Sequence, residues 1–182
     1  MLQEYDIFKN LSKWKVLQPF FADPHKNNIG LRELSRTIGL STPSVKLHLK
    51  QLVKEGVLKN GIFRRMPVYC ANQNDERFRE LKKINNINLL HKTGFIQHIF
   101  NKCQPNVMIL FGSASRGEDT EESDIDLYLE CAEQQLDLSL FEKELKRKIQ
   151  LHFYDSINRV NSKELKNNLL NGIILEGYIK VF

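Results

Sequence analysis

The sequence predicts an α+β protein, and three observations support that fold class. Residues 1–74 carry short runs with apolar residues at helical spacing and then an Asn-Gly turn between apolar strands, which indicates three helices and a β-hairpin. Residues 75–104 carry one long helical pattern, which predicts a linker helix. Residues 105–182 mix short apolar strands with amphipathic helices, which indicates a mixed α/β domain with a small sheet.

The 182 residues carry a net charge of +5, and that charge is divided unevenly along the chain. Residues 1–104 hold 18 Lys and Arg against 8 Asp and Glu, whereas residues 105–182 hold 9 against 14. This asymmetry points to two modules with different partners. A basic module attracts nucleic acid, and an acidic one needs a cation beside its carboxylates before it accepts a triphosphate.

The composition also excludes some classes of protein. No window approaches the ~18 consecutive apolar residues of a membrane span, and the first residues lack the basic start and apolar segment of a signal peptide. The three cysteines have neither metal-ligand spacing nor a disulfide framework. We therefore expect a cytoplasmic protein with reduced thiols and no membrane partner.

The first module should begin with three helices, and turn residues mark their ends. Pro19 bends or divides the first helix, Gly39 closes the second, and Pro43 lies in the first turn of the third. The predicted ranges are Leu2–Ala22, Leu31–Ile38, and a helix capped by Ser41 or Thr42 that ends at Gly56.

A basic hairpin should follow these helices. Asn60-Gly61 between Val57–Lys59 and Ile62-Phe63 is the preferred sequence of a two-residue turn, with Arg64 and Arg65 continuing the second strand. In this order of elements, Leu31–Tyr69 resembles the winged helix-turn-helix family of bacterial and archaeal transcription regulators.

The resemblance implies double-stranded DNA as a partner, with the third helix in the major groove. Leu47 lies on the outward face of that helix, where it suits a thymine methyl or a partner protein. Winged helices also serve as protein-contact modules, and that alternative stays open. The expected DNA contacts are Ser44, Lys46, Lys50, Arg64 and Arg65.

The helical pattern of Asp75–Phe100 carries a long apolar stripe, which Gly94 can interrupt. Such a helix can join the two modules, pack on the sheet of the second, or pair with a second copy. We favour a linker helix that also forms a homodimer, because winged helices usually bind DNA in pairs.

The second module is organised around Val107–Phe111, an apolar strand that leads through Gly112-Ser113 and an acidic loop to Asp124-Ile125-Asp126-Leu127. Alternation along a strand puts Asp124 and Asp126 on one face, where two carboxylates repel each other unless a cation lies between them. Mg²⁺ takes carboxylate oxygens together with substrate phosphates. Gly112 lets the backbone approach a phosphate, and Ser113 can start a helix whose free N–H groups face an anion.

This stretch resembles the DNA polymerase β-like nucleotidyltransferases, through the Gly-Ser pair and the Asp-x-Asp pair at this spacing. The resemblance implies that Gly112 and Ser113 bind the triphosphate of a nucleotide, ATP first, and that Asp124 and Asp126 are catalytic and hold Mg²⁺ or Mn²⁺. Arg116 is either a phosphate contact or an exposed helix residue. The short domain is similar to minimal nucleotidyltransferases, including antitoxins that adenylylate a toxin, so a co-encoded protein is a candidate acceptor.

The remaining pattern predicts a helix, a strand and a last helix. The helices are expected at Leu136–Lys148 and at Ser162–Leu170, with Ser162 or Asn161 as the cap of the second. The strand between them is Ile149–Tyr154. The segment Leu169–Tyr178 is similar to the end of the same family's domain.

The family pattern breaks at its third carboxylate, which the resemblance places on the strand Ile149–Tyr154. Gln150 stands there by position, and an amide neither carries negative charge nor accepts a proton near neutral pH. His152 on the same face is either a proton acceptor or a structural strand residue, and Asp155 fits only if the alignment slips. Two interpretations follow: a transferase that moves AMP from ATP, or a DNA-binding transcription regulator whose second domain senses nucleotide or has lost activity.

Overall fold

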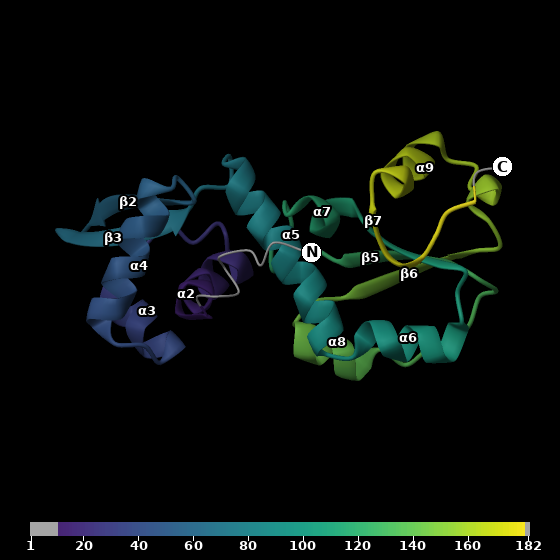
Figure 1. The fold of residues 1–182 in the computed structure, drawn as a ribbon, viewed down its shortest axis with the longest axis horizontal. Coiled ribbons are helices and arrows are strands. Elements are labelled where there is room, and N and C mark those ends of the chain that lie inside the picture. Colours follow the sequence, from purple (N-terminus) through teal and green to yellow (C-terminus); the bar gives the residue numbers. More distant parts are fainter. Residues whose placement is uncertain (1–10, 181–182) are drawn as a thin grey trace, which may run out of the picture. The chain divides into compact units, whose positions relative to one another are not determined.

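The computed structural model in Figure 1 describes residues 11–180. These residues divide between Arg79 and Glu80 into two compact units. The N-terminal part of the helix predicted at Leu2–Ala22 lies outside the described residues. Its C-terminal part is α2, Leu11–Ala22, which continues through Pro19 without a break.

Two further helices complete the helical part of the first unit, and both agree with the sequence prediction. Helix α3 is Leu31–Ile38, and Gly39 closes it with a left-handed backbone, φ 65°. Helix α4 is Thr42–Lys54, with Pro43 in its first turn and Ser41 at the N-cap. The inner faces of α2, α3 and α4 meet in one core, formed by Val16, Leu17, Phe20, Phe21, Leu34, Val45, Leu49 and Leu52.

The hairpin of the first unit turns four residues later than the sequence predicts. Strands β2 (Leu58–Phe63) and β3 (Met66–Ala71) are joined at Arg64-Arg65, whose φ angles of 48° and 64° are both positive. The observed register pairs six residues on each strand and buries Leu58 against Ala71, whereas a turn at Asn60-Gly61 would leave a first strand of three residues. The longer ladder of six residue pairs, with Leu58 buried at one end, therefore outweighs the local turn preference. The short β1 (Ile29–Gly30) pairs with β3 and gives the order β1-β3-β2.

The single helix expected at Asp75–Phe100 is two helices, α5 (Glu76–Lys92) and α6 (Phe95–Cys103). Gly94 interrupts them with a left-handed backbone, φ 73°. Asp75 caps α5, because its Oδ1 accepts hydrogen bonds from the backbone N–H groups of Arg77 and Phe78 at 3.0 and 3.3 Å. The apolar stripe is buried in α6, where its residues pack on the sheet of the second unit, whereas Leu81, Ile84 and Ile87 of α5 are half-buried.

The second unit contains a four-stranded sheet with the order β6-β5-β4-β7. Strands β5 and β6 run parallel, and the other pairs are antiparallel. The strands are β4 (Val107–Phe111), β5 (Ile125–Glu130), β6 (Ile149–Tyr154) and β7 (Ile173–Gly177).

Helices cover both faces of this sheet, as Figure 1 shows. One face packs against α6 and α8 (Ser139–Leu145), and the other against η1 (Ile157–Arg159) and α9 (Lys163–Leu170). Strand β4 lies between two neighbours and under both layers, so each of its five residues is buried. This position explains why its sequence is a continuous apolar run rather than an alternating one.

The last elements confirm two predictions and correct one. The strand Ile149–Tyr154 has the predicted bounds, and Ser162 caps α9 by accepting a hydrogen bond from the N–H of Leu165 at 3.1 Å. The helix expected at Leu136–Lys148 is shorter. It begins at Ser139, whose N–H donates to Oδ1 of Asp137 at 3.0 Å, and it ends at Lys146, whose φ is 55°. None of the helices within residues 11–180 is a candidate for a membrane span.

Candidate nucleotide and metal site

The turn at Gly112 and the Asp126 carboxylate lie side by side. Strand β4 ends at Phe111, whose partner across the sheet is Asp126 of β5. Gly112 follows with φ 72°, and a Cβ built on it would lie 2.6 Å from the Oδ2 atom of Asp126. Glycine is therefore required twice, for its backbone angle and for the space beside the carboxylate. Helix α7 (Gly112–Arg116) begins at this point, and the Ser115 hydroxyl donates to the Gly112 carbonyl at 2.9 Å.

The two aspartates share a face as strand alternation predicts. Asp124 directly precedes β5, and Asp126 is its second residue; both side chains are half-buried. Ile125 and Leu127 point to the opposite face and are 5% and 0% exposed in the α6–α8 core. The buried pair thus fixes the register that puts both carboxylates on the other face, with Asp126 beside Gly112.

Gln150 reaches the same place from the parallel strand β6. It pairs with Asp126 in the sheet register, and its side-chain Nε2 donates a hydrogen bond to Oδ2 of Asp124. Where the family pattern places a third carboxylate, this chain therefore has the amide of Gln150, which donates a hydrogen bond to the carboxylate of Asp124.

His152 lies on the same face of β6, two residues further on. Its Nε2 is 3.6 Å from Oδ1 of Asp126, and its ring meets the Phe111 ring edge-on with 5.1 Å between centroids. Within residues 11–180 this nitrogen is buried and has no hydrogen-bond partner.

The donor set fits a hard divalent cation only in part. Asp124 and Asp126 supply carboxylate oxygens, but the described residues contain no group of three or more His, Cys, Asp or Glu side chains arranged for a metal ion. An octahedral Mg²⁺ needs six ligands, so phosphate oxygens and water have to complete the shell.

Arg116 is already engaged. Its Nε donates to Oε2 of Glu118 at 2.7 Å, and both side chains are about half exposed. A phosphate that recruits Arg116 has to compete with this exposed ion pair, which is worth little in water.

The sequence reasoning missed a group of charged residues behind the site. Asp119 and Lys82 are buried, and Arg147 is mostly buried and donates hydrogen bonds into the loop before Asp124. Their contacts join residues 28 to 37 positions apart, so no local pattern reveals them. A weak indication of this group in the sequence is Arg147, which lies between Lys146 and Lys148 at the end of an amphipathic run.

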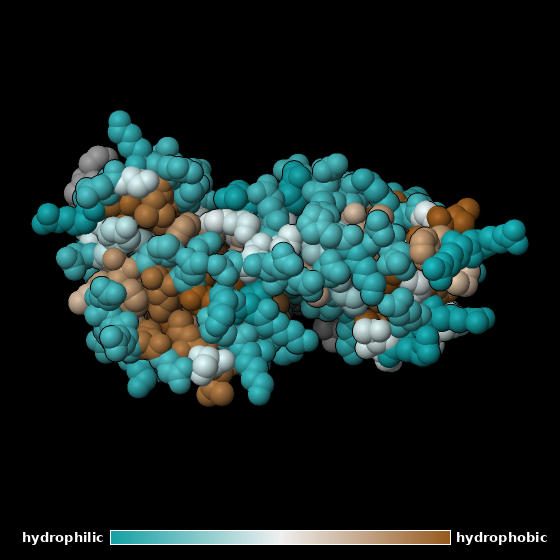
Figure 2. Space-filling model, turned by 180° about the vertical axis from the view of Figure 1, so that it is seen from behind, coloured by the Kyte–Doolittle hydropathy of each residue, from teal (hydrophilic) through white to brown (hydrophobic). Residues whose placement is uncertain are grey.

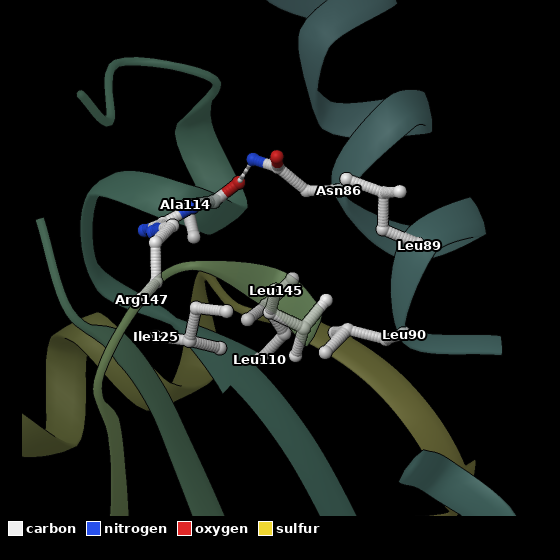
Figure 3. Close-up of a pocket in the computed structure, with 8 residues that line it drawn as sticks. All are labelled: Asn86, Leu89, Leu90, Leu110, Ala114, Ile125, Leu145 and Arg147. Atoms are coloured by element: carbon white, nitrogen blue, oxygen red, sulfur yellow. Dashed lines mark hydrogen bonds between the residues drawn. The ribbon is translucent and has the colours of Figure 1, made fainter. Parts of the chain in front are cut away.

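The pocket drawn in Figure 3 lies next to this group and is not a ligand site. Its volume is about 20 Å³, and most of its walls are leucine and isoleucine side chains. That volume admits about one water molecule, whereas small-molecule sites have volumes of roughly 300–1,000 Å³.

In the first unit, the structure brings the expected DNA contacts to two places. Lys46 and Lys50 are exposed one turn apart on α4, with half-buried Ser44 near the start of that helix. Arg64 and Arg65 are exposed at the hairpin turn rather than inside a strand. The hairpin also exposes three large apolar side chains, Ile62, Phe63 and Met66, and Figure 2 shows hydrophobic residues at this hairpin among hydrophilic ones.

Comparison with protein families gives two matches. Residues 94–179 match the family described as polymerase beta, nucleotidyltransferase, and residues 26–59 match the family described as winged helix-turn-helix DNA-binding. The first match includes Gly112, Asp124 and Asp126, and the second includes α3 and α4. Comparisons with curated proteins and with solved structures found no significant match. The chain therefore joins a winged helix-turn-helix domain to a nucleotidyltransferase domain of the polymerase β family.

Proposed function

We propose that this protein is a metal-dependent nucleotidyltransferase that binds double-stranded DNA through its winged helix. The donor is a nucleoside triphosphate, ATP first, with Mg²⁺ or Mn²⁺, and the acceptor is a hydroxyl group, with a co-encoded protein as the first candidate. Gly112 and Ser113 bind the triphosphate with Arg116 in reach of it, and Asp124 and Asp126 hold the metal.

The observation that carries this proposal is the contact between the Gly112 backbone and the Asp126 carboxylate, with Asp124 on the same face. A phosphate at the start of α7 and a cation on the two carboxylates then lie next to each other. Metal and nucleotide should bind together, because each supplies ligands or charge that the other needs. When bound, the metal polarises the phosphate and stabilises the pyrophosphate leaving group.

Removing the carboxylates tests the proposal. Asp124→Asn with Asp126→Asn should abolish metal-dependent ATP binding in titration calorimetry without unfolding the protein, because it relieves like-charge repulsion. The matched control is Glu121→Gln with Glu122→Gln. It removes the same amount of charge from two exposed residues of the same loop. If ATP binding with Mg²⁺ survives the Asp changes untouched, the site assignment is wrong.

Transfer itself is measured with labelled ATP and then the other triphosphates, to the protein itself or to a co-encoded protein. Gln150→Asp should raise transfer at least tenfold if Gln150 occupies the third carboxylate position. The opposite pattern, full activity in the natural protein and loss of it in His152→Ala, would identify His152 as the proton acceptor.

A DNA-binding transcription regulator with a nucleotide-sensing or inactive transferase domain is the second candidate function. The hydrogen bond from the Gln150 amide to Asp124 favours it, because that amide neutralises no metal charge and accepts no proton. Under this alternative, ATP with Mg²⁺ binds and changes DNA affinity, and no transfer occurs.

We also propose that the protein acts as a homodimer, as winged helices on two-fold sites do. The apolar stripe of α5 and α6 gives this pairing little support, since Phe78, Leu90, Phe95 and Ile99 are buried and only Leu81, Ile84 and Ile87 are half-buried. Light scattering at micromolar concentration decides the point, and a clean monomer would remove the proposal.

A further inference from the structure

A buried ion network lies behind the two aspartates, entirely within residues 80–182. Its centre is Asp119, whose side chain is only 4% exposed. Nη1 of Arg147 and Nδ2 of Asn86 donate to its two carboxylate oxygens at 2.8 and 2.9 Å, and Nζ of Lys82 lies 3.6 Å from Oδ2. Lys82 is 1% exposed and also donates to the backbone carbonyl of Asp119.

Arg147 extends this network to the metal-binding loop. Its Nε donates to the carbonyl of Ser123 at 2.6 Å, and its Nη2 donates to the carbonyl of Asp124 at 2.8 Å. With Nη1 on Asp119, all three guanidinium nitrogens bind the loop between residues 119 and 124. A planar guanidinium with fixed donors sets three acceptor positions at once, which a lysine cannot do.

The other end of the network holds the phosphate-binding turn. The Asn86 amide that donates to Asp119 also donates to the carbonyl of Ala114 in α7 at 3.0 Å, the bond drawn as a dashed line in Figure 3. Asp119 therefore connects α7, where the triphosphate is proposed to bind, with Asp124, where the metal is proposed to bind.

The network has more basic than acidic side chains. Two cations, Lys82 and Arg147, face the single buried carboxylate of Asp119. Burial lowers the pKa of the Arg147 guanidinium, and the negative charges of Asp119, Asp124 and Asp126 oppose that effect. Burial also lowers the pKa of the Lys82 ammonium, and the charge of Asp119 opposes that effect.

We propose that Arg147 is a positioning residue for this site, an inference that rests on the proposed function. Its three hydrogen bonds fix the backbone of Asp124 relative to Asp119, and the Asn86 amide joins Asp119 to α7. Removing Arg147 should weaken metal binding without removing any metal ligand, as changes in supporting residues commonly do by 10- to 100-fold.

The test compares Arg147→Lys and Arg147→Gln with the natural protein. The readouts are the Mn²⁺ concentration that half-saturates ATP-dependent binding, the electron paramagnetic resonance spectrum of the bound Mn²⁺, and the thermal midpoint. Arg147→Lys should raise the half-saturating Mn²⁺ concentration about tenfold, because charge remains but the three-point geometry is lost. Arg147→Gln should raise it further, and both spectra should differ from that of the natural protein.

Tyr128→Phe controls for a general loss of stability. Its hydroxyl donates to Glu130 at 3.1 Å at the C-terminal end of β5, two residues beyond Asp126, so this change removes a buried hydrogen bond that involves neither Arg147 nor its partners. It should lower the thermal midpoint and leave Mn²⁺ binding unchanged. If it weakens Mn²⁺ binding as much as Arg147→Lys does, the role of Arg147 is merely structural.

Asp119→Asn is the second variant, in case Arg147→Gln does not fold. It keeps the shape of the side chain and removes the charge that orients Arg147, so it should weaken Mn²⁺ binding in the same direction. Unchanged binding and spectra in folded Arg147→Lys and Asp119→Asn would overturn the inference. Failure of the natural protein itself to bind Mn²⁺ with ATP would instead refute the proposed function.

Discussion

Gly112 and Gly94 have nearly the same backbone angle and different surroundings. Their φ angles are 72° and 73°, so a side chain is strained at either position by about 1–2 kcal/mol. A Cβ on Gly94 meets no heavy atom of the described residues within 4 Å, whereas one on Gly112 reaches the Asp126 carboxylate. Alanine variants at Gly94 and Gly112 therefore separate the effect of backbone strain from the effect of displacing the Asp126 carboxylate.

We predict that Gly112→Ala and Gly94→Ala lower stability by similar amounts and that only Gly112→Ala weakens ATP binding, by at least tenfold. The cause is displacement of the Asp126 carboxylate by the new methyl group. Thermal unfolding and ATP titration with Mn²⁺ measure the two effects. Equal losses of ATP affinity in both variants would show that the Gly112 contact has no role of its own.

Residues that act through local spacing could be predicted from the sequence, and residues that act across the fold could not. Asp124, Asp126 and Gly112 follow from strand alternation and a turn within fifteen positions of each other. Asp119 and Arg147 meet only because β6 lies parallel to β5 after a chain reversal through α8. Parallel neighbours require such long connections, so their contacts leave no local pattern.

At the scale of elements, the hairpin of the first unit carries a turn that its residues disfavour. Arg64 and Arg65 both have positive φ, the backbone of a two-residue turn that Asn-Gly adopts most readily. Asn60 and Gly61 instead lie inside β2, opposite Tyr69 and Val68. The strained turn holds two arginines at the tip of the hairpin. Arginine at these positions lowers the stability of the turn and places two positive charges on the surface.

Arg64→Asn with Arg65→Gly should therefore stabilise the protein by about 1–2 kcal/mol while weakening its binding to duplex DNA. Arg64→Gln with Arg65→Gln is the control, because it removes the same charges and keeps the unfavourable turn residues. The control should lose the same DNA affinity and gain no stability. A thermal midpoint that does not rise in the Asn-Gly variant would contradict the turn assignment.

The junction between α8 and β6 depends on one carboxylate. Glu142 accepts hydrogen bonds from the Ile149 N–H at 3.1 Å and from Nζ of Lys148 at 3.0 Å. The Ile149 N–H first, and then Lys148, lower the pKa of Glu142 from its usual 4.5. A depressed carboxyl pKa means that the stabilisation is present above 4.5 and is lost as pH falls through the folded-state value.

Glu142→Gln should consequently lower the thermal midpoint near neutral pH and flatten its decline below about pH 4.5. Thermal unfolding across an acid pH series measures both effects. Glu144→Gln is the matched control, an exposed acid on the same helix, and its pH dependence should match that of the natural protein. An equally steep decline in Glu142→Gln would show that other carboxylates control acid unfolding.

At the scale of the whole molecule, the charge asymmetry is consistent with the proposal that DNA binds the basic residues 1–104 and that the nucleotide binds the acidic residues 105–182.

The domain types and most helices could be predicted, because periodicity and caps are local. The division between compact units, at Arg79 and Glu80, falls inside α5 and has no composition change to mark it. Because α5 contributes residues to both units, its helical pattern continues across the boundary between them.

Neutralising Lys46, Lys50, Arg64 and Arg65 with Gln in the full chain should weaken duplex DNA binding and reduce its salt slope by up to ~3.6, because each phosphate contact contributes ~0.9. The control neutralises four exposed lysines of residues 80–182, namely Lys92, Lys102, Lys143 and Lys163, for the same change in net charge. Binding is measured by fluorescence anisotropy over a salt series. Equal losses in both variants would indicate a long-range charge effect, and no loss in either would identify the module as a protein-contact module.

The pairing of β7 with β4 has a consequence for synthesis of the chain. The first unit is complete once residue 79 has been made, but β4 keeps one open edge until Ile173–Gly177 arrives more than sixty residues after it. Until then a nascent chain exposes the unpaired edge of an apolar strand, VMILF, of the kind that recruits other chains into aggregates. Chains that stop before Ile173 should therefore retain a folded winged helix and aggregate through β4. Strand β7 thus protects the strand that leads into the proposed nucleotide site.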